Sequence, residues 1–507
     1  MVVLRPSKLA RTAAAMVVVA ACAPIAGIEE KPCVPACVDE KTRLVCDAKG
    51  QPHEESCVTS DETCADYYCE QGACAARPAV GRACGPSGTA KCNEGYACLG
   101  PELKLSAIEE HACVLADDGK IWCWGNNKYG RLGDGTEQWG TNPVPVLHLP
   151  ARATAVGVGY AHTCAVLETG DIYCWGVNIA GQIGTGTASE KILEPTKVEV
   201  DPPGTRFTTV AAGLGHTCAL TEQHTVYCWG NTIEGQCGAD AAVVGTTVRA
   251  RLVEGLDRVV SIETVKHHTC VVRDAAPTMM CWGSNRYLDN GHEVIVDHKL
   301  GPGAHGADNS AKPVPVDLGS DVLDIGMGFE STFAVTVDGR LLAWGFYSDG
   351  ATGTERPADD IVRDPLPVLA QSTRTVAPIR FVLNVIRSNG SDQCAEVSDA
   401  APYGARYLCW GYNDNGELGY ADPSADGKRF PYGNPVKALP ASGKQLVRGH
   451  DFACAATHEA DADEIWCYGR AGNLGNGDLQ VANGVIPDQL VAAPVQWVPE
   501  HFAPFLK

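Results

Sequence analysis

The sequence predicts an all-β protein, a seven-bladed β-propeller preceded by a small disulfide-rich module. One frame recurs seven times along the chain, and "HTCAVLETGDIYCWG", residues 162–176, shows it most clearly. Within "DIYCWG" both alternating sets of side chains are apolar, so we expect a strand in a small sheet that is covered on both faces. Such sheets, stacked around an axis, form a propeller.

The first 21 residues are typical of a lipoprotein signal peptide. Arg5, Lys8 and Arg11 precede an apolar stretch that is too short to span a bilayer core of roughly 30 Å. The "VAAC" sequence, residues 19–22, resembles a bacterial lipobox, which predicts cleavage before Cys22 and lipidation of that residue. A plain signal peptide is the alternative. We therefore expect a protein of the bacterial cell envelope, lipid-anchored in the outer membrane or at the surface, and otherwise secreted.

Residues 22–32 are interpreted as the lipidated N-terminus and linker of a cysteine-rich module at 33–98. Ten of the chain's 24 cysteines lie in this module, among polar spacers that cannot bury much core. So many cysteines indicate export to an oxidising compartment and predict disulfides. Zinc binding is the competing interpretation, but the paired C-x2-C knuckles typical of four-cysteine zinc sites do not occur. The spacing leaves the connectivity open.

The propeller is expected over residues 99–507, with one disulfide in each of six blades. Each pair flanks a short turn and so closes one hairpin, which stabilises the fold by about 3 kcal/mol in the chain-entropy model. The predicted pairs are Cys113–Cys123, Cys164–Cys174, Cys218–Cys228, Cys270–Cys281, Cys394–Cys409 and Cys454–Cys467. The remaining copy has Phe333 and Ala343 at both positions, as a bonded pair requires. Cys237 has no partner in this scheme and aligns with apolar positions, so we expect it free and buried.

Each copy is interpreted as four short strands, the first of which is a segment such as "PVPVLHL", residues 143–149. Turns at Asp118-Gly119, Thr169-Gly170 and Asp338-Gly339 are expected to join the last two strands. The first copy lacks the initial strand, so we expect residues 493–498, "APVQWV", to complete the first blade and close the ring. An open solenoid is the alternative, but it would leave two exposed edges.

At this level of detail the chain resembles the regulator-of-chromosome-condensation repeat family, in its exported bacterial branch. The resemblance rests on "HTCAVLETGDIYCWGVNIAGQIGTG", "WGNNKYGRLGDG" and "WGYNDNGELG", and it weakens at "WGSNRYLDNG" and "WGFYSDGATG". It implies a seven-bladed propeller that serves as a protein-binding platform. Guanine-nucleotide exchange would follow by analogy alone, since no stretch matches the inserted exchange element of the best-known member.

Four histidines recur two residues before a repeat cysteine, and they are the most conspicuous candidates for a site: His111, His162, His216 and His268. A ring of metal ligands is one interpretation. We favour a structural role, a hydrogen bond to backbone within each blade, because ligands about 2 Å from one metal cannot come from four blades. The sequence contains no nucleophile elbow, H-E-x-x-H or P-loop motif. We therefore expect no catalytic residues, no metal and no cofactor.

Ligand binding is expected on the face formed by the loops that follow each Trp-Gly. These loops lengthen in the fourth blade, from Trp282 to Pro313, and in the sixth, from Trp410 to Pro435. Tyr and Arg are enriched where binding energy concentrates. The candidate ligand-binding residues are Tyr287, His292, His298, His305, Tyr412, Tyr420, Arg429 and Tyr432. Tolerated insertions of flexible composition are the alternative.

The function expected from these features is that of a surface-anchored, non-catalytic binding propeller, a monomer that recognises a protein or a glycan. An exported lyase or hydrolase with a site near the propeller axis is the alternative. The formal net charge of −21 argues against nucleic acid as a partner, because phosphate binding needs clustered Lys and Arg.

Overall fold

The computed structural model divides the chain into two compact units, Met1–Pro101 and Glu102–Lys507. In the first unit it describes five strands, and in the second the following ranges: 104–116, 118–238, 245–285, 287–289, 292–294, 299–302, 309–328, 330–346, 352–354, 361–371, 376–379, 382–388, 392–397, 406–413, 417–419, 429–436, 443–459, 462–469 and 489–494. No helix among these residues is long and apolar enough to cross a membrane. The predicted lipidation site Cys22 lies outside the described residues.

The first unit contains two small antiparallel sheets. One has the order β1-β2-β3 and the other is the pair β4-β5. The strands are β1 (Ala36–Asp39), β2 (Thr42–Cys46), β3 (Pro52–Ser56), β4 (Asp66–Glu70) and β5 (Ala73–Arg77). The side chains of the predicted cysteine module are outside the description.

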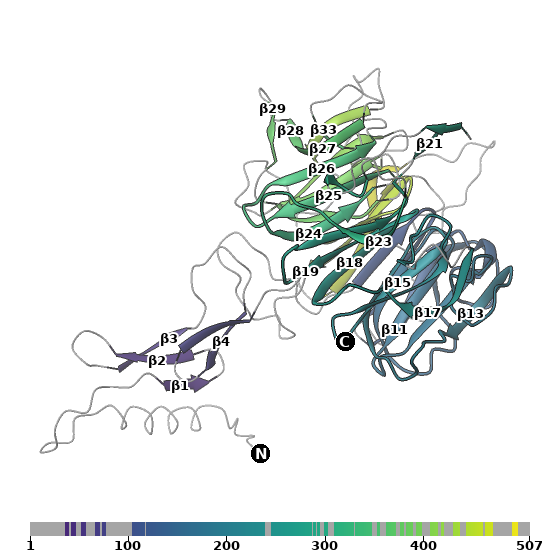
Figure 1. Ribbon diagram of the computed structural model, residues 1–507, viewed down its shortest axis with the longest axis horizontal. Coiled ribbons are helices and arrows are strands. Elements are labelled where there is room, and N and C mark those ends of the chain that lie inside the picture. The colour runs from purple at the N-terminus through teal and green to yellow at the C-terminus, as the bar shows by residue number, and fades with distance from the viewer. Residues whose placement is uncertain are drawn as a thin grey trace, which may run out of the picture. The chain divides into compact units, whose positions relative to one another are not determined.

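The second unit is the predicted propeller, and each of its seven sheets is built around four antiparallel strands (Figure 1). The first three blades comprise β6 (Lys104–Ile108), β7 (His111–Leu115), β8 (Ile121–Gly125) and β9 (Gly140–Pro145); β10 (Ala153–Val158), β11 (His162–Leu167), β12 (Ile172–Val177) and β13 (Lys191–Lys197); and β14 (Phe207–Ala212), β15 (His216–Thr221), β16 (Val226–Asn231) and β17 (Thr246–Leu252). A short 3-10 helix, η1 (Lys128–Gly130), follows β8.

The remaining four blades repeat this order with two insertions. They comprise β18 (Val259–Val265), β19 (His268–Arg273), β20 (Met279–Gly283) and β23 (Ser310–Pro315); β24 (Val322–Met327), β25 (Ser331–Thr336), β26 (Leu341–Phe346) and β27 (Ile361–Pro367); β30 (Val382–Ile386), β31 (Asp392–Val397), β32 (Tyr407–Tyr412) and β33 (Arg429–Pro435); and β34 (Gly443–Arg448), β35 (Phe452–Glu459), β36 (Ala462–Gly469) and β37 (Gln489–Pro494). The inserted strands are β21 (Tyr287–Asp289), β22 (His292–Val294), β28 (Leu369–Gln371) and β29 (Val376–Pro378).

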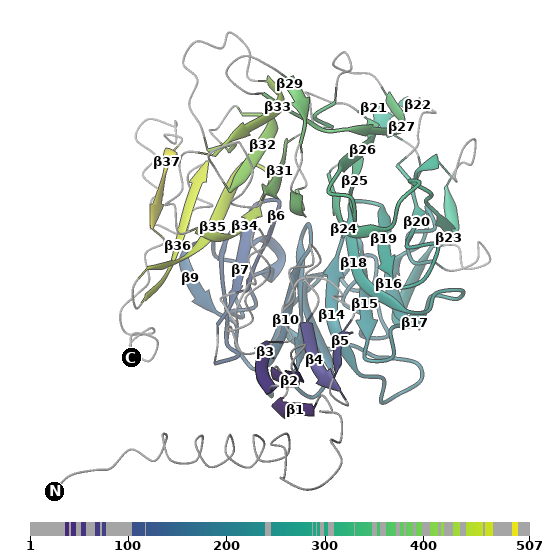
Figure 2. The same cartoon turned by 90° about the vertical axis from the view of Figure 1, so that its left-hand side faces the viewer.

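The strand order corrects the division into blades that the sequence suggested. The "PVP" segment belongs to β9, which pairs with β8 and is therefore the last strand of the first blade rather than the first strand of the second. Correspondingly, β37 pairs with β36 and completes the seventh blade, not the first. Alternation and turns locate strands in a sequence, but they do not tell which neighbouring sheet takes each strand. Figure 2 shows the first strands β10, β14, β18 and β24 at the centre of the ring, with β17, β23 and β27 toward its periphery.

The core lies between neighbouring blades. The aromatic residue after each second cysteine position is fully buried there, and the set is Trp124, Trp175, Trp229, Trp282, Trp344, Trp410 and Tyr468. One cluster joins the first and last blades, with Leu105 and Trp124 packed together with Phe452 and Ile465. Ring closure therefore rests on packing between two complete sheets.

The six predicted cysteine pairs are disulfides in the structure, each with 4.1 Å between the two Cα atoms. Each joins directly opposed residues of a hairpin, as in the Cys164–Cys174 pair of β11 and β12. Phe333 and Ala343 occupy the same register in the fifth blade. Cys237 is free and buried, and burial raises the pKa of its thiol.

Candidate functional site: the loop face

Two kinds of connection meet on one end of the propeller, which we call the loop face. In an antiparallel sheet the turn after the first strand and the loop after the third emerge on the same side. In the second blade a hydrogen bond joins them directly, from the Val177 amide to the Ala161 carbonyl over 2.9 Å. The loop face is therefore built by seven inner turns and seven outer loops.

In four of the blades an asparagine stabilises the outer loop, because its side-chain oxygen accepts a hydrogen bond from a backbone amide further along the same loop. The Oδ1 atom of Asn127 accepts a hydrogen bond from the Leu132 amide at 2.9 Å, and Asn178 does the same for Ile183 at 3.1 Å. The Gly-Gln-Leu-Gly element then turns toward the next blade. Its last glycine, Gly184 in the second blade, has a φ of +79°, and a Cβ there would lie 2.8 Å from Nε1 of Trp229. These contacts explain why the repeat has Asn at the start of the loop and Gly at the end of this element.

The fourth blade retains this element, although the resemblance to the repeat weakens at "WGSNRYLDNG". The Leu300 amide donates to Oδ1 of Asn285 at 3.2 Å, so "KLG" at 299–301 takes the place of "GQLG". Lys299 and Leu300 follow an insertion that contains the β21–β22 hairpin. In the sequence, "KLG" could have been matched to "RLG" and "ELG" of other blades. The insertion places it further from Trp282 than the spacing of the repeat predicts.

The recurring histidines connect neighbouring blades. The Nε2 atom of His111 lies 3.0 Å from the hydroxyl of Thr163 in the second blade, and His162 reaches Thr217 of the third at 2.9 Å. The Thr163 hydroxyl donates to the Arg131 carbonyl at 2.9 Å, so Nε2 of His111 is the donor in the first pair. The predicted structural role holds for these residues, but the predicted partner, backbone within the same blade, was wrong.

The same connection joins the next two blades. His216 reaches Thr269 at 3.0 Å, and His268 reaches Thr332 at 3.1 Å. All four rings are buried, and burial is the first cause that lowers their pKa, to about 3 for His162 and His216. These side chains are therefore neutral at physiological pH, and each binds the next blade through Nε2.

The sixth and seventh blades use a charged pair instead. Asp392 replaces the histidine and forms an ion pair with Arg448, which is completely buried. The Arg448 guanidinium also donates to the Glu417 carbonyl at 2.6 Å, the position at which Thr163 and Trp175 meet Arg131 earlier in the ring. Between the last and the first blade the corresponding residues are Phe452 and Ala112, an apolar contact.

Arg387 spans the axis at the loop face. It follows β30 of the sixth blade, yet Nη2 donates to the Val158 carbonyl of the second blade at 2.6 Å. Nη1 donates to the Thr264 carbonyl of the fourth blade at 3.4 Å and lies 3.7 Å from the Glu263 carboxylate. A guanidinium carried by the sixth blade therefore binds the second and the fourth blades.

A second buried ion cluster lies between the fourth and fifth blades. The Glu330 carboxylate accepts from Nζ of Lys299 at 2.6 Å and forms an ion pair with Lys266. Glu330 and Lys299 are each only 3% exposed, and the two lysine charges hold the pKa of Glu330 below its usual value despite burial. Both lysines are therefore held by one carboxylate within the protein.

The described part of the loop face also carries exposed apolar side chains over the second and third blades. Ile179 is 63% exposed, Ile233 71% and Tyr160 39%. Ile179 and Ile233 stand at the same position of successive outer loops, and Tyr160 in an inner turn. These residues are not among the predicted ligand-binding residues, although "NIAGQIG" and "TIEGQCG" place an isoleucine at the same point of the repeat.

Most of the predicted ligand-binding residues cannot be placed on this face. His298, His305 and Tyr420 lie outside the described residues, and for Tyr287, His292 and Arg429 only the strands are described. Tyr412 and Tyr432 are half-buried in β32 and β33.

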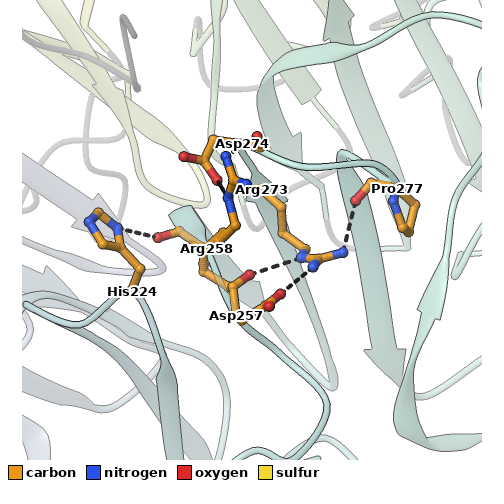
Figure 3. Close-up of polar contacts among 7 residues, drawn as sticks. His224, Asp257, Arg258, Arg273, Asp274 and Pro277 are labelled. Atoms are coloured by element: carbon orange, nitrogen blue, oxygen red, sulfur yellow. Dashed lines mark hydrogen bonds and ion pairs between the residues drawn. The ribbon is translucent and has the colours of Figure 1, made fainter. Parts of the chain in front are cut away.

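On the opposite end of the fourth blade the charges pair with one another (Figure 3). Arg258 donates to Asp274 at 2.6 Å, and Arg273 forms an ion pair with Asp257. The Asp-Arg dipeptide at 257–258 is therefore paired with the Arg-Asp dipeptide at 273–274. The His224 ring bonds the Val259 carbonyl at 3.0 Å. This network joins the linker before β18 to the β19–β20 hairpin. Both of its arginines have acceptors within the network.

The chain is similar to several known proteins. Residues 89–455 match the RCC1-like domain. The chain is 26% identical to the ultraviolet-B receptor UVR8 of Arabidopsis thaliana over 67% of its own length and 71% of the receptor. It is 27% identical to the human E3 ubiquitin-protein ligase HERC2 over 50% of its length, but spans only 5% of that protein. The crystal structure of Prp20p from Saccharomyces cerevisiae superposes with a TM-score of 0.59 at 22% identity, covering 76% of this chain and 87% of Prp20p.

Proposed function

Because the chain belongs to the RCC1-like domain family, we propose that it is a non-catalytic binding propeller that presents its loop face to a protein or glycan ligand at the cell surface. The observation that carries the proposal is the contrast along the ring. The strands and their cores repeat from blade to blade, whereas the outer loops change in length and residue type, with the longest between Gly283 and Ser310. A rigid scaffold with varied loops on one end is typical of binding proteins.

The state of the polar groups near the axis favours binding over catalysis. A general base needs a reachable nitrogen or oxygen with a pKa near the working pH. The histidine rings bind threonines between blades, with pKa values lowered by burial, and Arg387 donates to backbone carbonyls. These groups are committed to holding the ring together. The alternative of an exported lyase or hydrolase would need a site elsewhere, and exchange activity has support from family analogy alone.

Surface anchoring is part of the same proposal and rests on the N-terminal sequence. "VAAC" after a short apolar stretch predicts a diacylated Cys22. Metabolic labelling with palmitate in a bacterial host is expected to mark the wild-type protein but not Cys22→Ser. Label retained by that variant would contradict the anchor.

The loop face is tested by attaching a bulky polymer to one end of the propeller or to the other. Lys128→Cys places a thiol on an outer loop, and Val337→Cys places one on a hairpin turn at the opposite end; Val337 is 51% exposed. Each variant is coupled to a 5-kDa-class maleimide polymer and used to capture partners from envelope extracts. We expect the polymer at 128 to abolish capture and the polymer at 337 to leave it intact. The reverse result would move the binding surface to the hairpin end.

A further inference from the structure

Four apolar residues of neighbouring turns and loops on the loop face are called the loop-face patch: the exposed Tyr160, Ile179 and Ile233 and the half-buried Leu214. The Tyr160 amide donates to the Gly213 carbonyl at 3.0 Å, which places it beside Leu214. A Cβ on Gly215 would lie 3.9 Å from Cβ of Ala180 and 3.6 Å from Cβ of Asn231. The Leu214-Gly215 turn is therefore flanked by the two loops whose tips are Ile179 and Ile233.

The composition of the patch favours a protein segment over a glycan. Isoleucine offers no hydrogen bond, so sugar hydroxyls placed on it would lose their water without replacement. Its branched side chain is stiff, which reduces the entropy lost on binding. Exposure above 60% at two equivalent loop tips leaves apolar area that a partner can remove from water. At the equivalent tip of the first blade stands Lys128, whose Nζ lies 5.0 Å from the centre of the Tyr129 ring, so the patch ends there.

Carboxylates border this surface, while the nearest buried cations are bound within the protein. Glu109 and Glu110 stand in the inner turn of the first blade, and the charge of Glu109 is the first cause that raises the pKa of Tyr160. Arg131 lies beneath, donating to the carbonyls of Lys128 and Tyr160, both at 3.1 Å. Glu234 follows Ile233 directly and is half-buried; its Oε2 is buried without a hydrogen-bond partner, and its charge also acts on Lys266 and His267. Lys266, on the far side, binds Glu330.

We propose that the loop-face patch binds a protein segment with apolar side chains whose flanks carry Lys or Arg. This inference rests on the proposed binding function of the loop face and specifies its partner. Ile179 and Ile233 act as the two anchors, and Glu109 with Glu234 selects the basic flanks. The net charge of −21 for the whole chain steers such a partner toward the protein.

The test selects peptides against the full chain from a displayed library of random 12-residue sequences, in parallel with a glycan array. We expect enrichment of apolar peptides with basic flanks. A synthetic copy of the best peptide should lose at least about tenfold in affinity for Ile179→Ser and for Ile233→Ser. The matched controls are Leu252→Ser and Leu323→Ser, which remove exposed leucines away from the patch (48% and 42% exposed) and should change affinity less than about twofold.

The charge requirement is tested separately. Exchanging the peptide's Lys and Arg for Glu should weaken binding at least about tenfold at low salt, and Glu109→Gln should reduce the salt dependence of the original peptide. Melting temperature and protection of Cys237 from alkylation verify that each variant is folded.

Three results would overturn the inference. Unchanged affinity in both isoleucine variants would exclude the patch, and enrichment of acidic or wholly polar peptides would exclude the assigned chemistry. Glycan binding without any peptide binding would exclude a protein segment. The proposed binding role of the loop face is tested independently and fails if the polymer at position 128 leaves capture intact, so the two failures are distinguishable.

Discussion

At the residue scale, neighbouring blades are joined by pairs of residues, and where one member of the pair differs from the common type the other member differs too. His162 with Thr217 is the common pair, Asp392 with Arg448 replaces it between the sixth and seventh blades, and Phe452 with Ala112 replaces it where the ring closes. In the sixth-to-seventh contact Ala453 stands at the threonine position and Arg448 of the inner strand supplies the donor. The first two pairs join buried polar side chains to one another, and the third replaces them by apolar groups.

The histidine pairs predict a loss of stability in mild acid. An unfolded histidine has a pKa of about 6.5, whereas burial lowers the pKa of His162 in the folded protein to about 3. Between these values the unfolded chain binds more protons, so this stability is complete above about pH 6.5 and falls by about 1.4 kcal/mol per pH unit toward pH 3. Urea unfolding from pH 7 to pH 4 measures the slope.

The control for this pH dependence is a double variant that copies the contact between the last and the first blade. His162→Phe with Thr217→Ala copies the apolar pair at the closure and leaves Trp229 to satisfy the Gln182 carbonyl, to which it donates at 2.8 Å. The double variant should lose one histidine's share of the pH dependence. An unchanged slope would show that His162 does not carry it.

His224 predicts a second effect of a single residue. It stands at the hairpin position occupied by Gly119 and Gly170 in the preceding blades and has a φ of +62°. A side chain in this region costs about 1–2 kcal/mol relative to glycine, and the bond of the ring to the Val259 carbonyl offsets part of that cost. His224→Ala keeps the strain and removes the bond, so it should be less stable than His224→Gly by about 1 kcal/mol. Equal melting temperatures of the two variants would contradict this account.

At the element scale, the cysteine hairpin was predictable because its two positions are lost together. Phe333 and Ala343 replace a cysteine pair in one copy, and they are direct partners in β25 and β26. The loop face was harder to predict. Ile179 comes from one repeat and Leu214 and Ile233 from the next, and their loops lie side by side only because inner turns and outer loops share one end of the ring. A single sequence shows each isoleucine as an ordinary loop residue.

The register of the fifth blade predicts that a disulfide can be introduced there. Phe333→Cys with Ala343→Cys occupies the position at which the other blades hold Cα atoms 4.1 Å apart, so the bridge should form on expression in an oxidising compartment. Mass spectrometry without reduction detects it. The gain in stability should be small, because the Phe333 ring packs against Trp410 at 5.9 Å between centroids and is lost.

The adjacent pair serves as the control. Ala334 and Leu342 are the next partners in the same hairpin, and their side chains point to the other face. Neighbouring pairs alternate between narrow and wide spacing. Ala334→Cys with Leu342→Cys should therefore form a bridge less completely. Equal yields for both variants would contradict the assigned register.

At the scale of the whole molecule, interactions across the axis add to those around the ring. Arg387 joins the sixth blade to the second and the fourth, which are not neighbours. Its partners lie more than a hundred residues away along the chain, so no local pattern could indicate them. The ring of seven blades was predictable from the repeat, whereas the contacts of Arg387 across it depend on the finished geometry.

The manner of ring closure yields the last prediction. The sequence suggested that the final strand completes the first blade, whereas β37 pairs with β36, at Cys467↔Ala493 and Gly469↔Gln489. Removal of residues 489–507 should therefore accelerate hydrogen exchange at the amides of β36. The amides of β8 should keep their protection, because β9 covers that strand. The Cys454–Cys467 disulfide holds the remaining hairpin together, and the contact of Trp124 with Phe452 keeps the first and last blades packed. Faster exchange in β8 with unchanged β36 would restore closure through the first blade and reject the strand pairing described above.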